Sequence, residues 1–135
     1  GWEELYGGPV EVPDPQAVST VAASRLDWDE PARPEHARLL AWYRDLVALR
    51  RRVPALASGD RAATRVETGD GWVVLWRGDV CVAVVVADEP RDVPVGGAAR
   101  VLAAWEPVTA SGGVARLAGR SVAVLGPEAG TPPHD

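Results

Sequence analysis

Two tryptophans, Trp72 and Trp76, are the residues whose type and spacing most suggest binding chemistry. They lie four positions apart in a run of alternating character, so an extended strand places both indole rings on one face. Such a pair can stack on sugar rings, or it can pack in a core beneath neighbouring elements, which is the more frequent use of paired aromatic residues. The sequence leaves open a carbohydrate-binding platform and a packing role.

The residues that bind metals in other proteins are few and scattered. His36 and His134 are the two histidines, and neither has a second ligand at a metal-binding spacing. Asp27, Asp29 and Glu30 gather three carboxylates, but the glycine and distal glutamate of a calcium loop are missing. We expect these acids to form a solvated approach to a helix N-terminus, and we predict no metal and no cofactor.

Nucleophilic chemistry has no clear carrier in this chain. Cys81 lies within the most apolar run, where a small buried side chain is expected rather than a reactive thiolate. No nucleophile elbow, phosphate loop or dinucleotide fingerprint occurs. A glycosidase needs two carboxyl groups about 5 to 9.5 Å apart across a cleft, and most acids here fall in predicted turns and loops. We predict no catalytic residue.

Composition limits the remaining function classes. The chain has 135 residues, of which 47% are hydrophobic and 24% charged, as in a single globular domain with or without a tail. Its net charge of -5 argues against nucleic-acid and membrane-surface partners. One cysteine and an opening without a signal-peptide pattern lead us to expect a cytoplasmic protein.

A long amphipathic helix is the clearest element that could position side chains. From Pro34 to Val53, apolar residues recur at intervals of three and four positions, as one face of an α-helix requires. The stripe consists of Leu39, Trp42, Leu46, Leu49 and Val53, and Leu40, Tyr43 and Val47 widen it. Pro34 suits the first helical position, and Pro54 ends the helix. A stripe this wide needs a partner surface, either a sheet or another helix.

The part from Gly59 onward has the two-residue period of β-strands. The expected strands are 62–67, 72–76, 80–87, 99–105, 114–118 and 121–125. We expect loops over residues 1–33 and 88–97, which are rich in proline or glycine. These patterns predict an α+β, mainly β fold: a loop and one long helix, then a small antiparallel sandwich or sheet of about six strands.

Two stretches of the sequence carry a resemblance to a known family. The first is Val12-Pro13-Asp14-Pro15-Gln16; the second is Ser24-Arg25-Leu26-Asp27-Trp28, followed by His36, Leu39-Leu40, Tyr43-Arg44, Leu46, Leu49-Arg50-Arg51 and Pro54-Ala55-Leu56. Together they resemble the C-terminal region of the malto-oligosyltrehalose trehalohydrolases, which are members of the α-amylase family of glycoside hydrolases. Residues 17–21 depart from the Asp-Pro-x-Thr-Phe that this family usually has there.

This resemblance implies a domain organisation. Residues 1–57 are expected to be the end of a (β/α)₈ barrel with its last helix, residues 58–126 a C-terminal antiparallel β domain, and residues 127–135 a flexible tail. The family's retaining mechanism uses an aspartate nucleophile, a glutamate acid/base and a supporting aspartate on earlier barrel strands. No motif of this chain carries those three residues. Asp14 and Gln16 match a family segment and are candidate substrate contacts.

The expected function follows from this organisation. The chain, which opens on Gly1 without an initiator methionine, is expected to be a fragment of a hydrolase that releases trehalose from maltooligosyl trehalose. Its role would be accessory and stabilising, with the parent barrel packed on the 34–53 helix, a maltooligosaccharide as a possible ligand and no activity alone. The alternatives are a free-standing carbohydrate-binding module that uses Trp72 and Trp76, or the C-terminal domain of a branching or debranching enzyme.

Overall fold

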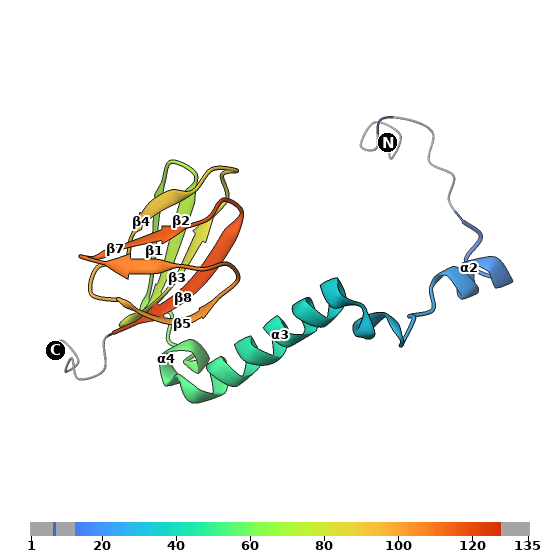
Figure 1. The fold of residues 1–135 in the computed structure, drawn as a ribbon. Coiled ribbons are helices and arrows are strands. Elements are labelled where there is room, and N and C mark those ends of the chain that lie inside the picture. The colour runs from blue at the N-terminus through green and yellow to red at the C-terminus, as the bar shows by residue number, and fades with distance from the viewer. Residues whose placement is uncertain (1–6, 8–12, 128–135) are drawn as a thin grey trace. The chain divides into compact units, whose positions relative to one another are not determined.

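The structure is a computed structural model that describes Gly7 and residues 13–127 (Figure 1). It divides into two compact units, Gly1–Ala37 and Arg38–Asp135, which are treated separately below. The boundary expected at residue 57 falls inside the second unit. Residues 128–135 of the expected tail lie outside the described part of the chain.

The described part of the first unit, before the long helix, contains two short helical elements that the sequence pattern does not predict. Helix α2 spans Val18–Ala23, and the 3-10 helix η1 spans Glu30–Ala32. The expectation of a loop over residues 1–33 is therefore wrong for these two segments. Both are short and contain no buried residue, so they lack the periodic apolar face by which a helix is recognised in a sequence.

The long helix α3 spans Pro34–Arg52 and ends one residue before its predicted end (Figure 1). Its first turn carries Glu35 and its last turn three arginines, which suits the helix dipole. Val53 is extended, with φ -109° and ψ 101°, because Pro54 follows it. The proline then opens a further short helix, α4, at Pro54–Ala57.

Up to residue 127, eight strands follow the helices, and every paired neighbour runs antiparallel. They are β1 (Thr64–Gly69), β2 (Trp72–Arg77), β3 (Val80–Val85), β4 (Arg91–Pro94), β5 (Arg100–Ala104), β6 (Thr109–Ser111), β7 (Val114–Leu117) and β8 (Ser121–Gly126). A five-stranded sheet has the order β1-β2-β3-β8-β5, and a three-stranded sheet has the order β4-β7-β6. The α+β, mainly β class predicted from the sequence is confirmed.

The predicted count of about six strands is too low, because β4 and β6 were not expected. Strand β4 lies in the segment interpreted as a loop, and it ends at Pro94. Both strands are edges of the three-stranded sheet, where a residue without a backbone N–H is tolerated. Strands of three and four residues are also too short to show a two-residue period.

The two sheets enclose the main hydrophobic core. Strand β3 contributes Cys81, Ala83 and Val85 to it, and Val93 and Leu117 join from the smaller sheet. Residues one position out of phase on β3 face the opposite side of the sheet. There Val80 is buried together with Leu49 of α3 and Val124 of β8 in a second, smaller cluster. Part of the predicted helix stripe is therefore covered by this chain's own sheet.

Candidate functional site

The tryptophan pair lies on the face of β2 that points into the sandwich. Trp76 is 8% exposed, Val74 between the two rings is fully buried, and Trp72 packs against the same core. The guanidinium of Arg65, the cross-strand neighbour of Trp76, lies 4.9 Å from the centre of that ring. The structure thus places both rings in packing positions. Sugar stacking by this pair stays a prediction, and Trp76 has little ring surface to offer it.

Asp14 and Gln16 lie together in the first unit, just before α2. The Oδ1 atom of Asp14 accepts a hydrogen bond of 2.9 Å from the backbone N–H of Gln16. This contact forms a local turn in which an aspartate side chain replaces a backbone acceptor. Both side chains are exposed. Contact of either residue with substrate stays a prediction.

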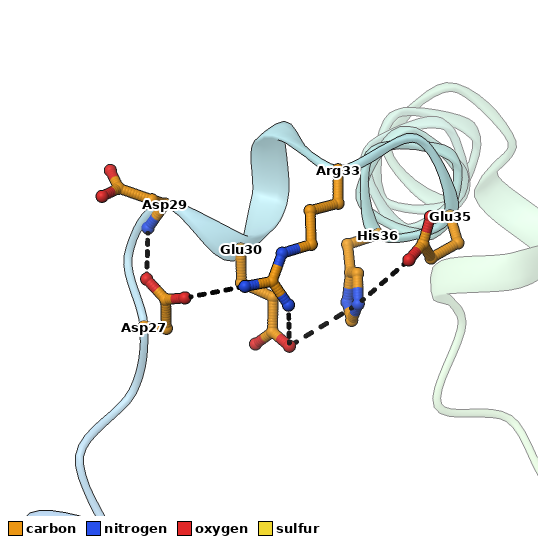
Figure 2. Close-up of polar contacts among 6 residues, drawn as sticks. All are labelled: Asp27, Asp29, Glu30, Arg33, Glu35 and His36. Carbon is orange, nitrogen blue, oxygen red and sulfur yellow. Dashed lines mark hydrogen bonds and ion pairs between the residues drawn. The ribbon is translucent and has the colours of Figure 1, made fainter.

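The acidic segment before α3 forms a network of polar contacts (Figure 2). Asp27 accepts a 3.0 Å hydrogen bond from the backbone N–H of Asp29 and pairs with Arg33 at 3.2 Å. Arg33 also lies 3.8 Å from a carboxylate oxygen of Glu30. These contacts tie the approach of the chain to the helix, but ion pairs this exposed add little stability.

His36 extends the same network into the first turns of α3. Its Nε2 atom lies 3.5 Å from Glu30 and 4.0 Å from Glu35 (Figure 2). Within the part of the chain that the structure describes, no group of three or more histidine, cysteine or acidic side chains could hold a metal ion. The other histidine, His134, lies outside that part. The network is a structural connection between the segment 27–33 and the helix.

Helix α3 presents two different apolar regions along its length. Leu46 and Leu49 pack on the five-stranded sheet. Leu39, Tyr43 and Val47 are 46%, 61% and 50% exposed. They follow one another at intervals of four residues, which places them on one flank of the helix. We call these three residues the exposed flank of α3.

The outward face of the five-stranded sheet is also only partly covered. Val80 and Val82 contact the cluster beneath the helix. Farther along the same face, Val84 and Val122 line an open depression of about 380 Å³, and Val86 at its side is 63% exposed. Contiguous exposed apolar surface marks contact sites on many proteins. Its signal in the sequence is the unbroken apolar run over residues 80–87, which favours burial on both faces.

Two tryptophans far apart in the sequence, Trp42 of α3 and Trp105, are in contact. The rings of Trp42 and Trp105 lie edge to face, with centres 5.7 Å apart and planes inclined by 69°. Arg38 lies 4.0 Å above the Trp105 ring and pairs with Glu106 at 2.7 Å. Sequence reasoning missed this cluster, because only folding brings residues 105 and 106 to the helix.

None of the described helices is long and apolar enough to cross a membrane. No protein-family model matches the sequence. Three related proteins, each named malto-oligosyltrehalose trehalohydrolase, match most of it. The protein from Rhizobium sp. (strain M-11) is 42% identical over 92% of this chain, and that from Mycobacterium tuberculosis (strain H37Rv) is 37% identical over 85%. The protein from Arthrobacter ramosus is 42% identical over 72%.

The matches cover most of this chain but only a small share of each relative. The chain spans 21%, 20% and 16% of the length of these three relatives. Both the long helix and the β-sandwich fall within a match of 126 residues, since that match leaves out only a few positions of this chain. Over most of its length, this chain is therefore similar to a segment that makes up about a fifth of malto-oligosyltrehalose trehalohydrolases.

Proposed function

We propose that this chain is the C-terminal accessory part of a trehalose-forming glycoside hydrolase, which it stabilises without taking part in catalysis. The observation that carries the proposal is the 42% identity over 92% of the chain to a protein named malto-oligosyltrehalose trehalohydrolase. In this arrangement α3 is the last helix of the catalytic barrel, and the β-sandwich follows it. The whole hydrolase would release trehalose from maltooligosyl trehalose.

The two apolar regions of α3 support this arrangement. The helices of a (β/α)₈ barrel surround the strands and must turn an apolar face toward them. In this chain one side of α3 already packs on the sandwich, whereas Leu39, Tyr43 and Val47 remain open to solvent. A helix placed between two layers needs both kinds of surface. We assign the exposed flank to the barrel and the other side to the sandwich.

The absence of activity in the chain alone follows from how barrel enzymes build their sites. Catalytic groups come from loops at the carboxyl ends of several strands of the barrel. A retaining glycosidase also needs two carboxyl groups about 5 to 5.5 Å apart beside a sugar-binding cleft. The acids that gather before α3 are instead exposed and paired with Arg33 and His36. The carboxylates of the whole enzyme would therefore come from its other segments.

The test uses the Rhizobium relative with its matching segment of 126 residues removed. We expect the shortened relative to lose thermal stability and trehalose-releasing activity, and to recover part of both when the 135-residue chain is added. Trehalose release by the chain alone would refute the proposal. So would full stability and activity of the shortened relative without the chain.

Matched variants locate the contact. Tyr43→Glu places a charge on the exposed flank and is expected to prevent recovery, because burying an unpaired carboxylate against the barrel is costly. Arg44→Glu introduces glutamate at the next position, which is exposed but lies outside the exposed flank. This variant is expected to leave recovery intact. Equal recovery with both variants would contradict the assignment of the flank.

A further inference from the structure

A groove separates helix α3 from strand β5 within the second unit. It has a volume of about 190 Å³ and is lined by Trp42, Asp45, Ala48 and Arg52 of the helix and by residues 102–104 of the strand. Ala48 lies between the two charged residues, and Ala103 and Ala104 stand on the strand. The short side chains leave space between the walls. We call this space the α3–β5 groove.

Two charged side chains of opposite sign stand along the helix wall. Asp45 and Arg52 are seven residues apart, which is about two helical turns or roughly 10 Å. They are too distant along the helix to form an ion pair with each other. Neither belongs to any ion pair among residues 13–127. Within the described part of the chain, the groove therefore offers a carboxylate acceptor and a guanidinium donor that have no ion-pair partner.

The aromatic wall is held in a fixed orientation. Trp42 is half-buried, and its ring is set by the edge-to-face contact with Trp105. Trp105 is supported in turn by Arg38, which covers its ring and donates a 2.6 Å hydrogen bond to its backbone carbonyl oxygen. A ring fixed before binding loses little conformational entropy when a ligand packs on it.

The opposite wall is the outermost strand of the five-stranded sheet. Strand β5 is the last strand in the order of the five-stranded sheet, so one of its edges has no neighbouring strand. Its register against β8 shifts between Val101 and Ala103, which takes Leu102 out of the ladder. A bulge of this kind bends an edge strand locally.

The combination of these groups selects the class of ligand. A simple anion would meet Asp45, and a simple cation would meet Arg52, so a neutral molecule with both donors and acceptors fits better. A cavity of about 150 Å³ holds one benzene ring, so this groove has room for one six-membered ring. We propose that the α3–β5 groove binds a pyranose ring of an oligosaccharide, with Trp42 against its C–H face and Asp45 and Arg52 on its hydroxyl groups.

The groove and the exposed flank lie on different sides of α3. At 100° per residue, Asp45 and Arg52 point to nearly the same direction, whereas Tyr43 and Val47 point to the other side of the sheet-facing Leu49. A partner on the exposed flank therefore leaves the groove open. The inference goes beyond the proposed function, and only the choice of a glucose oligomer as a probe rests on it.

The experiment titrates the full chain with maltotetraose and follows binding by calorimetry. We expect saturable binding in the millimolar range, as a shallow site for one ring would give. Ala48→Leu fills the groove with a good helix former and should abolish binding without unfolding the helix. Asp45→Asn and Arg52→Gln should each weaken binding by about tenfold, because each loses a charge-assisted hydrogen bond.

The controls are Arg44→Leu and Arg51→Gln, which change exposed residues of the same helix that do not line the groove and are each turned by about 100° from Asp45 or Arg52. Both should bind as the unchanged chain does. The proposal is overturned if maltotetraose does not bind, if Ala48→Leu still binds it, or if inorganic phosphate binds in its place. The titration uses no barrel, so its result is independent of the recovery experiment. If the chain binds maltotetraose but does not restore the shortened relative, the proposed sugar site stands and only the proposed function is rejected.

Discussion

The two faces of the five-stranded sheet differ in how completely this chain covers them. The inner face is closed by the three-stranded sheet, and Val74, Ala83 and Leu125 on it are fully buried. On the outer face Val124 is buried near α3, but Val66 is 57% exposed. The same sheet thus has one face that is fully buried at its centre and one face that is buried only in part. Because buried apolar surface is the main source of stability, we expect the inner face to contribute more to the stability of this chain than the outer face does.

The largest effect is expected for a change in the inner core. Leu117→Ala removes a fully buried side chain from between the sheets and should lower the free energy of unfolding by about 4 kcal/mol. Urea unfolding of the chain, followed by circular dichroism, measures it. Val114→Ala on the same strand is the exposed control and should cost less than about 1 kcal/mol. Equal losses would show that the sandwich is not the main source of stability.

The next effect is expected at the contact between the helix and the sheet. Leu49→Ala truncates the one buried residue of α3, so the free energy of unfolding should fall by about 2 to 3 kcal/mol. The loss is smaller than for Leu117 because the cluster around Leu49 has fewer buried members and can relax toward solvent. A loss larger than that of Leu117→Ala would reverse the ranking of the two faces.

The thiol of Cys81 gives the inner face a dependence on pH. Burial raises the pKa of this thiol from 9.0 to about 11. Its contribution to stability is therefore complete below pH 9 and is lost as the pH rises toward 11, since the unfolded chain ionises first. The loss amounts to about 3 kcal/mol at most, since each unit of pKa corresponds to about 1.4 kcal/mol.

Urea unfolding at pH 8 and pH 11 measures this loss for the chain and for Cys81→Ala. The lower pH lies below the ordinary pKa of 9.0, and the higher pH lies at the raised pKa of about 11. Other groups that titrate in this range act on both proteins, so the difference between them isolates the thiol. If the chain and Cys81→Ala lose the same stability between the two pH values, the thiol is solvated in the native state.

The smallest effect is expected on the exposed flank of α3. Val47→Ser changes a half-exposed residue and should alter the free energy of unfolding by less than about 0.5 kcal/mol in the isolated chain. The same urea experiment tests it. A loss above about 1 kcal/mol would mean that this chain's own residues cover the flank, and the flank would no longer be available to a barrel.

Local pattern predicted much of the fold. The apolar period and the two prolines placed α3 within one residue of its end, and the two-residue alternation put Trp72 and Trp76 on one strand face. The same reasoning failed for β4 and β6. Those strands are short edges, and pairing with β7 rather than an internal pattern makes them strands.

The candidate sites divide in the same way. The sequence indicated that Trp72 and Trp76 act together, but it could not choose between stacking on a sugar and packing, because that choice depends on which face the second sheet covers. The groove had no sequence signal at all. It joins Asp45 and Arg52 to residues fifty or more positions later, and sequence periodicity carries no information about such a distance.

The sequence by itself determined the helix, the central strands and the presence on α3 of an apolar stripe that needs a partner surface. These follow from spacing along the chain, where the periods of helix and strand act over a few residues. Only the tertiary structure decided that Leu46 and Leu49 lie on the sheet while Tyr43 and Val47 stay open. The physical reason is that burial depends on what long-range packing brings against a surface, and the apolar residues of the stripe are chemically alike.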